Sequence, residues 1–171
     1  KSKKNINKNL VLEKLKPLLE DSSIKKIGQN IKFDFIIFFK QGIELNSMED
    51  TMLMSYVLDA GKNRHNMDTL AEIHLGHKTI SFKDLVGSGK KEINFSEVNL
   101  EKAKDYAAED ADITLRLYQK FKKNLKTEKM TNLYETFEKP LIKILAFMEI
   151  EGIMIDNKFL KILSSKFEKK I

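Results

Sequence analysis

The sequence contains no cysteine and no tryptophan. Without cysteine the chain can form neither a disulfide framework nor a thiolate zinc site, and it suits a reducing interior. We therefore expect a cytoplasmic protein. Since tryptophan is absent while phenylalanine occurs 11 times, we expect a core built from Phe, Leu, Ile and Met.

Long apolar runs are missing as well. The longest, Phe35–Phe39, falls far short of the ~20 residues that a membrane helix needs. The basic, polar N-terminus lacks the apolar stretch of a secretory signal. We therefore expect no membrane partner.

Length and charge set broad limits. The 171 residues, 42% of them hydrophobic, suit one domain, or one domain and part of another. The 31 basic and 25 acidic residues give a formal charge of +6, with much of the excess at the two ends. An anionic partner such as nucleic acid is compatible with this charge. From charge alone, a lysine-rich solvated surface is the favoured explanation.

The hydrophobic pattern predicts a mostly helical chain with little strand. Residues 25–30 should form a short strand that ends in a turn containing Gly28. Residues 76–99 should form a long surface loop. A polar stretch at 122–131 marks a candidate domain boundary, and residues 152–155 should be a short strand or extended. Helices are expected over residues 10–20 (bent or ended by Pro17), 33–40, 49–58 (with a cap around Asp50-Thr51), 67–75, 100–121, 132–151 (bent at Pro140) and 156–171 (capped by Asp156).

One good strand is odd for a complete α/β domain. If that strand belongs to a sheet, its neighbours should lie upstream of Lys1. We therefore expect the chain to be a fragment.

The helix predicted over 100–121 carries a carboxylate where an apolar residue is expected. Asp110 falls within the stripe that should be buried, and Tyr106 lies one turn earlier on the same face. A buried carboxylate needs a cation, several hydrogen bonds or a metal. A basic partner, or a slight rotation toward solvent, would also account for Asp110. The stripe consists of Ala103, Tyr106, Ala107, Asp110, Ile113, Thr114, Leu117 and Phe121, whereas Glu101, Asp105, Glu109 and Asp112 should face water.

Asp34 is a second acid on an apolar face, between Phe33 and Phe35. Helix capping is the alternative role for it, and Asn30 is also suited to a turn or cap. Two such aspartates fit a magnesium site of oxygen ligands. Two ions roughly 4 Å apart can activate a water and stabilise the leaving oxygen of a phosphodiester, but holding both requires more carboxylates.

Two motifs resemble those of family A DNA polymerases. Residues 28–34, Gly-Gln-Asn-Ile-Lys-Phe-Asp, resemble the second exonuclease motif, N-x-x-x-[FY]-D, and residues 106–110 are similar to the third, Y-x-x-x-D. The similarity continues in order through residues 49–53, 64–72 and 77–82, and then through 137–141 and 151–156, which resemble the entry into the polymerase domain.

This resemblance implies an α/β fold of the ribonuclease H-like 3′→5′ exonuclease type over residues 1–125, without its N-terminal strands. Residues 126–171 would begin the polymerase domain. The implied chemistry is proofreading of DNA 3′ ends during replication and repair with two Mg²⁺ ions, for which Mn²⁺ or Zn²⁺ could substitute. The implied partner is a single-stranded 3′ end or primer-template, and the protein is expected to be a monomer. The implied roles are metal binding for Asp34 and Asp110, orientation of the attacking water for Tyr106, and substrate contact for Asn30, Phe33 and Arg64.

One departure limits what the chain can do alone. The family's first motif, D-x-E on an early strand, has no counterpart here, because Glu13, Glu20 and Asp21 lie on or beside a helix. We therefore expect the isolated chain to be neither a nuclease nor a polymerase. Two alternatives remain open: a ribonuclease D-type RNA exonuclease, and a non-catalytic DNA-holding domain of a polymerase.

Overall fold

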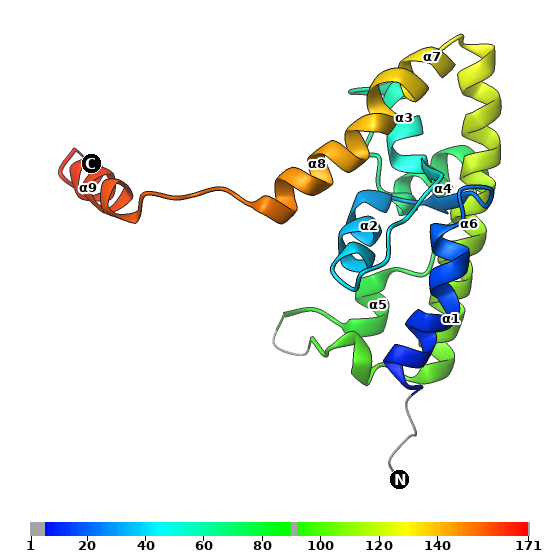
Figure 1. Cartoon of the computed structure of the whole chain (residues 1–171), viewed down its shortest axis with the longest axis horizontal. Coiled ribbons are helices and arrows are strands. Elements are labelled where there is room, and N and C mark those ends of the chain that lie inside the picture. Colours follow the sequence, from blue (N-terminus) through cyan, green and yellow to red (C-terminus); the bar gives the residue numbers. More distant parts are fainter. Residues whose placement is uncertain (1–5, 90–91, 171) are drawn as a thin grey trace.

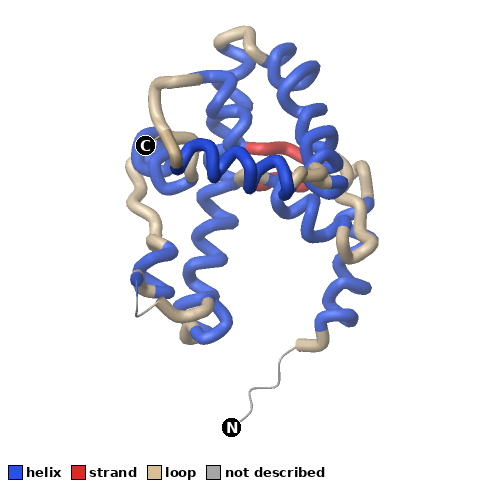
Figure 2. Tube along the Cα trace, turned by 90° about the vertical axis from the view of Figure 1, so that its left-hand side faces the viewer, coloured by secondary structure: helices blue, strands red, loops and turns tan. Residues whose placement is uncertain are grey.

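The computed structural model describes residues 6–89 and 92–170, so the predicted basic cluster at Lys1, Lys3 and Lys4 lies outside the described residues. Helices surround a small two-stranded sheet (Figures 1 and 2). Strands β1 (Lys26–Gly28) and β2 (Met48–Asp50) are parallel, with Ile27 opposite Glu49. The helices are α1 (Lys8–Glu20), α2 (Ile31–Phe39), α3 (Thr51–Asp59), α4 (Met67–Leu75), α5 (Phe82–Val86), α6 (Leu100–Thr127), α7 (Thr131–Leu133), α8 (Lys139–Glu151) and α9 (Asn157–Glu168), with a 3₁₀ turn η2 (Phe95–Glu97) and a π-helical turn η3 (Tyr134–Glu138).

Strand β2 corrects two predictions. The helix predicted over residues 49–58 begins at Thr51, and Asp50 caps the backbone N–H groups of Met52 and Leu53 as expected. Glu49, however, belongs to strand β2 and not to the helix. Strand β1 pairs with this downstream strand. The expectation that all its neighbours lie upstream of Lys1 was therefore wrong for this one partner; it stays a prediction for the other edge of β1.

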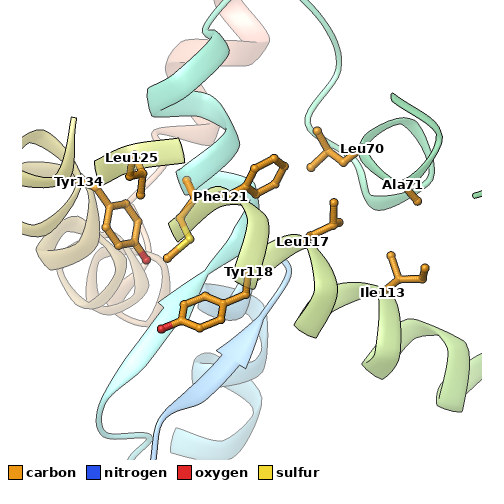
Figure 3. Close-up of a cluster of buried hydrophobic side chains, with 9 residues drawn as sticks. Leu70, Ala71, Ile113, Leu117, Tyr118, Phe121, Leu125 and Tyr134 are labelled. Atoms are coloured by element: carbon orange, nitrogen blue, oxygen red, sulfur yellow. The ribbon is translucent and has the colours of Figure 1, made fainter. Parts of the chain in front are cut away.

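Two apolar clusters form the core. The larger one joins α3, α4, α6 and η3 (Figure 3), and consists of Met54, Leu70, Ala71, Ile113, Leu117, Tyr118, Phe121, Leu125 and Tyr134. The second joins α2 to α8, and consists of Ile31, Phe35, Leu45, Met48, Ile142 and Ala146. The predicted Phe, Leu, Ile and Met side chains are present, together with two tyrosines.

Helix α6 is longer than predicted and is buried along a different stretch. Its buried residues begin at Ile113 and continue to Leu125, whereas Ala107 is exposed and Ala103 only half-buried. The predicted burial of the N-terminal half was wrong, because α3 and α4 cover only the C-terminal half of the helix. The proposed division at 125/126 falls inside α6 and stays a prediction.

The two prolines do not end their helices. Helix α1 continues through Pro17 to Glu20. Pro140 stands in the first turn of α8, directly after η3, where its missing N–H leaves no helical bond unmade.

The structure also tests the predictions for residues 152–155 and 76–99. Residues 152–155 are extended and pair with no strand in the described part of the chain, and Asp156 caps α9 as predicted. Helix α9 stands apart from the body (Figure 1). The predicted surface loop at 76–99 contains α5 and η2. Across residues 6–89 and 92–170, no helix has the length and apolar character to cross a membrane.

Candidate active site

Asp34 of α2 and Asp110 of α6 line one cleft of about 510 Å³. The end of β1 forms its floor. The remaining wall residues are Lys25, Ile27, Gly28, Gln29, Met67, Ala111, Thr114 and Leu115. Two carboxylates that are far apart in the sequence therefore face a common space, as the predicted site requires.

The position of Asp34 depends on how α2 begins. Asn30 adopts a left-handed conformation with φ of 62° and gives no side-chain cap, a backbone that Asn tolerates better than most residues. The cap comes instead from Asp50, whose Oδ1 and Oδ2 accept the N–H groups of Asn30 and Ile31 at 3.0 Å each. Asp34 follows in the first turn of α2.

Asp34 is less buried than predicted. The residue is exposed, and so is its neighbour Phe33 at 62%. Phe35, by contrast, is fully buried. Partial desolvation raises the pKa of the Asp34 carboxyl group. The aspartate thus lies on the open wall of the cleft and not among apolar neighbours.

Asp110 lies half-buried, and its surroundings are acidic. Its Oδ1 is buried and has no hydrogen-bond partner among the described residues. Burial raises the pKa of Asp110, a hydrogen bond from Tyr106 lowers it, and the nearby carboxylates of Asp68 and Glu109 raise it further. The result is a carboxyl group with an unmet need for a cation or a proton.

Tyr106 is held in its protonated form. Burial and the adjacent Asp110 raise the pKa of its hydroxyl to about 12. Its ring lies 6.1 Å from the rings of Phe82 and Phe95, which stack on each other at 5.8 Å. Tyr106 therefore presents a neutral O–H donor beside Asp110 at neutral pH.

Comparison with known proteins gives the family. A family model described as 3′–5′ exonuclease, of the DNA polymerase A type, matches residues 2–126. The chain belongs to this exonuclease family. The resemblance stated from the two motifs is confirmed.

The most similar relatives include three DNA polymerases I. The chain is 48% identical to that of Rhizobium leguminosarum over 91% of its length, 41% identical to that of Pseudomonas aeruginosa over 97%, and 40% identical to that of Borreliella burgdorferi over 94%. The chain spans only 15%, 19% and 17%, respectively, of the full lengths of these three relatives. Exonuclease domains of this family generally use divalent metals.

Two solved structures share the fold. The polymerase domain of Pol1 from Mycobacterium smegmatis, in complex with DNA primer-template and dNTP, superposes with a TM-score of 0.75 at 21% identity, over 96% of this chain and 25% of that one. Brucella melitensis NrnC bound to pGG gives a TM-score of 0.64 at 22% identity, over 91% and 72%. The α/β exonuclease fold predicted from the sequence is confirmed.

The exonuclease residues expected to contact substrate are not on the cleft wall. Asn30 lines a separate hollow of about 150 Å³ between α2, α3 and α8. Phe33 and Arg64 are exposed on the surface. Arg64 precedes His65, whose carbonyl accepts a 2.7 Å hydrogen bond from the side chain of Gln29 on the cleft floor. Their substrate roles stay predictions.

The aspartate pair fits part of the metal site expected of this exonuclease family. Oxygen ligands suit a hard divalent cation that completes its shell with water, and the unpartnered Oδ1 of Asp110 has a lone pair available. Among the described residues, however, no group of three or more His, Cys, Asp or Glu side chains could hold a metal ion. The two aspartates alone therefore do not make up the two-ion site that the sequence predicts.

Sequence reasoning missed contacts of three carboxylates that bind residues on or beside the cleft wall. Asp50 was recognised as a cap for α3, but its second role at the start of α2 was not. Glu109 was expected to face water, yet it accepts hydrogen bonds and is only 18% exposed. The third, Glu49, was seen only as part of a motif.

Glu49 is the centre of a buried charge cluster behind the cleft. Its side chain is 3% exposed, and its Oε1 lies 3.0 Å from the ammonium groups of both Lys25 and Lys139. The Tyr134 hydroxyl donates to its Oε2 at 3.0 Å. Burial raises the pKa of Glu49, but the two lysines outweigh that effect and hold it below its usual value. The cluster fixes Lys25 on the cleft wall.

Proposed function

We propose that this chain is part of a DNA polymerase I and belongs to the site that hydrolyses DNA 3′ ends during proofreading. Residues 1–125 would complete the exonuclease domain and residues 126–171 would begin the polymerase domain. The observation that carries the proposal is the convergence of Asp34 and Asp110 on one cleft, with Tyr106 one helical turn before Asp110 on α6.

Asp34 and Asp110 would hold Mg²⁺, or Mn²⁺ or Zn²⁺ in its place, together with the D-x-E carboxylates expected upstream. When bound, a pair of such ions activates a water and stabilises the leaving oxygen. The protein's own contribution is positional. Tyr106 keeps its proton, and its hydroxyl can hold the attacking water by accepting from it or donating to it. Because the first motif is not in this sequence, the isolated chain should be inactive.

The proposed substrate is the single-stranded 3′ end of DNA. The relatives at 40% to 48% identity are DNA polymerases I, which supports DNA as the partner. Asn30 and Phe33 are proposed to contact the terminal nucleotides and Arg64 the phosphate, which requires the strand to extend from the cleft across the exposed face of α2. The cytoplasmic location and the monomeric state also remain predictions.

The rival functions are less well supported. NrnC shares the fold at 22% identity, which says nothing of substrate, whereas the relatives at 40% to 48% identity are DNA polymerases I. A ribonuclease D-type enzyme is therefore not favoured. A non-catalytic DNA-holding domain is disfavoured because both motifs in the sequence are intact, and an upstream sequence without D-x-E would revive it.

Replacing Asp110 by alanine in the complete gene product tests the proposal. We expect 3′ trimming of a single-stranded oligonucleotide to be abolished while primer extension is retained. Asp112→Ala is the matched control, because Asp112 lies on the same helix with its side chain 62% exposed and pairs with Arg116 on the surface. Trimming by Asp110→Ala at the parental rate would exclude the proposed metal-ligand role.

A further inference from the structure

Glu109 connects α6 to the segment that precedes α5. Its Oε1 lies 2.7 Å from Nε2 of His77, and its Oε2 accepts the backbone N–H of Ile80 at 2.6 Å. Its neighbour Asp110 faces the cleft, so consecutive carboxylates on α6 serve different contacts. The proposed chemistry of Asp34, Asp110 and Tyr106 gives no role to Glu109.

The segment bound by Glu109 is also anchored to α4. The N–H of His77 donates to the carbonyl of Ala71, and the Thr79 hydroxyl donates to Asp68 Oδ1 at 2.7 Å. Residues 77–80 therefore run between α4 and α6 with hydrogen bonds to both. This stretch was expected to be part of a solvated surface loop, but its path is fixed at several points.

The next residues form the aromatic wall around Tyr106. Phe82 begins α5, directly after the bound segment, and stacks on Phe95. Both rings lie against Tyr106, which stands three residues before Glu109 on α6 and so on an adjacent part of its surface. Helix α6 thus contacts two successive parts of this segment: the carboxylate of Glu109 binds residues 77–80, and the ring of Tyr106 packs against Phe82.

We infer that Glu109 is a positioning residue: its carboxylate fixes residues 77–82 so that Phe82 and Phe95 confine the Tyr106 ring beside Asp110. Without this contact, the segment is held to α6 mainly by the rings themselves, and the phenol gains freedom to turn. The inference rests on the proposed function, because it concerns the residue that would orient the attacking water.

The test compares Glu109→Ala with Glu109→Gln in the complete gene product. Alanine removes both hydrogen bonds, whereas a glutamine amide can accept from Ile80 N–H and donate to an unprotonated His77. We expect kcat for trimming of single-stranded DNA to fall roughly 10- to 100-fold in Glu109→Ala with little change in KM. Glu109→Gln should recover most of the loss. Glu101→Ala is the matched control, since Glu101 lies on α6 with its side chain 72% exposed.

Three outcomes would overturn the inference: an unchanged kcat in Glu109→Ala, a loss confined to KM, or a Glu109→Gln enzyme as slow as the alanine variant. If Glu109→Ala does not fold, His77→Ala removes one of the two contacts and should lower kcat in the same direction. An unchanged kcat in His77→Ala would then overturn it.

Tyr106→Phe separates this inference from the proposed function. If Tyr106 orients the water, this variant is slow, and adding Glu109→Ala should slow it little further. A fully active Tyr106→Phe would refute the role proposed for Tyr106, whereas a slow Tyr106→Phe with a fast Glu109→Ala would refute only the role of Glu109. A readout besides activity is the ¹³C spectrum of the complete gene product with labelled tyrosine rings: Tyr106→Phe assigns the Tyr106 signal, and Glu109→Ala should shift it. An unshifted signal would count against the inference.

Discussion

Replacing Asp50 by alanine should strongly destabilise the fold, because one carboxylate caps two helices. The side chain is 1% exposed. It accepts the N–H groups of Asn30 and Ile31 at the start of α2, and those of Met52 and Leu53 at the start of α3. Losing an N-cap costs about 1 kcal/mol, and each buried donor left without a partner costs about 1–3 kcal/mol. We expect a loss of about 3–5 kcal/mol, allowing for two caps and partial relaxation.

The assay is urea unfolding followed by far-ultraviolet circular dichroism. Asp156→Ala is the matched control, because Asp156 caps α9 through two 3.0 Å hydrogen bonds but is exposed to solvent. Its effect should stay near 1 kcal/mol, the value of an ordinary cap. Asp50→Asn keeps one acceptor oxygen and should fall between the parent and Asp50→Ala. If Asp50→Ala cost no more than Asp156→Ala, the shared cap would not hold α2 and α3 together.

Two further predictions concern the core and the charge cluster. Phe121 is fully buried, so Phe121→Ala should lower the free energy of unfolding by about 3–5 kcal/mol. Phe137 is 63% exposed, so Phe137→Ala should change the free energy of unfolding by less than about 0.5 kcal/mol. Equal effects of the two substitutions would contradict the placement of Phe121 in the core. The lowered pKa of Glu49 means that its carboxylate stabilises the fold above the unfolded value of 4.5 and that this contribution disappears as pH falls through the folded pKa. Glu49→Gln should therefore be less stable than the parent at pH 7, with a difference that shrinks in acid; a gap that widened on acidification would contradict the ion-pair assignment.

Local signals in the sequence were sufficient for much of the secondary structure. Residues 67–75 were predicted to be a helix, and Gly76 ends it in a left-handed conformation. Asp156 and Asp50 were recognised as caps because a cap acts on N–H groups two and three residues ahead. Strand β2 was missed because it has only three residues, too few to show alternation, and because the last of them, Asp50, is also the cap of α3.

The candidate site was only partly visible in the sequence, since its contacts are long-range. The motifs identified Asp34, Tyr106 and Asp110, but periodicity alone could not tell which part of α6 the core would cover. The polar face of α6 suggested that Glu109 is solvated, and nothing near it in the sequence indicates His77 as its partner. That pairing depends on the path of residues 77–80 between two helices.

The cluster around Glu49 gives the cleft a fixed counter-charge. One carboxylate, Glu49, faces two lysines whose pKa values are both raised. Lys139 also lies 3.0 Å from Glu135, so the two lysines and the two carboxylates balance in charge at neutral pH. Lys25 brings its own positive charge to an otherwise acidic cleft, while Lys139 belongs to the helix that continues toward α9. Any rearrangement that pulled α8 away would leave Lys25 to neutralise the buried Glu49 without Lys139.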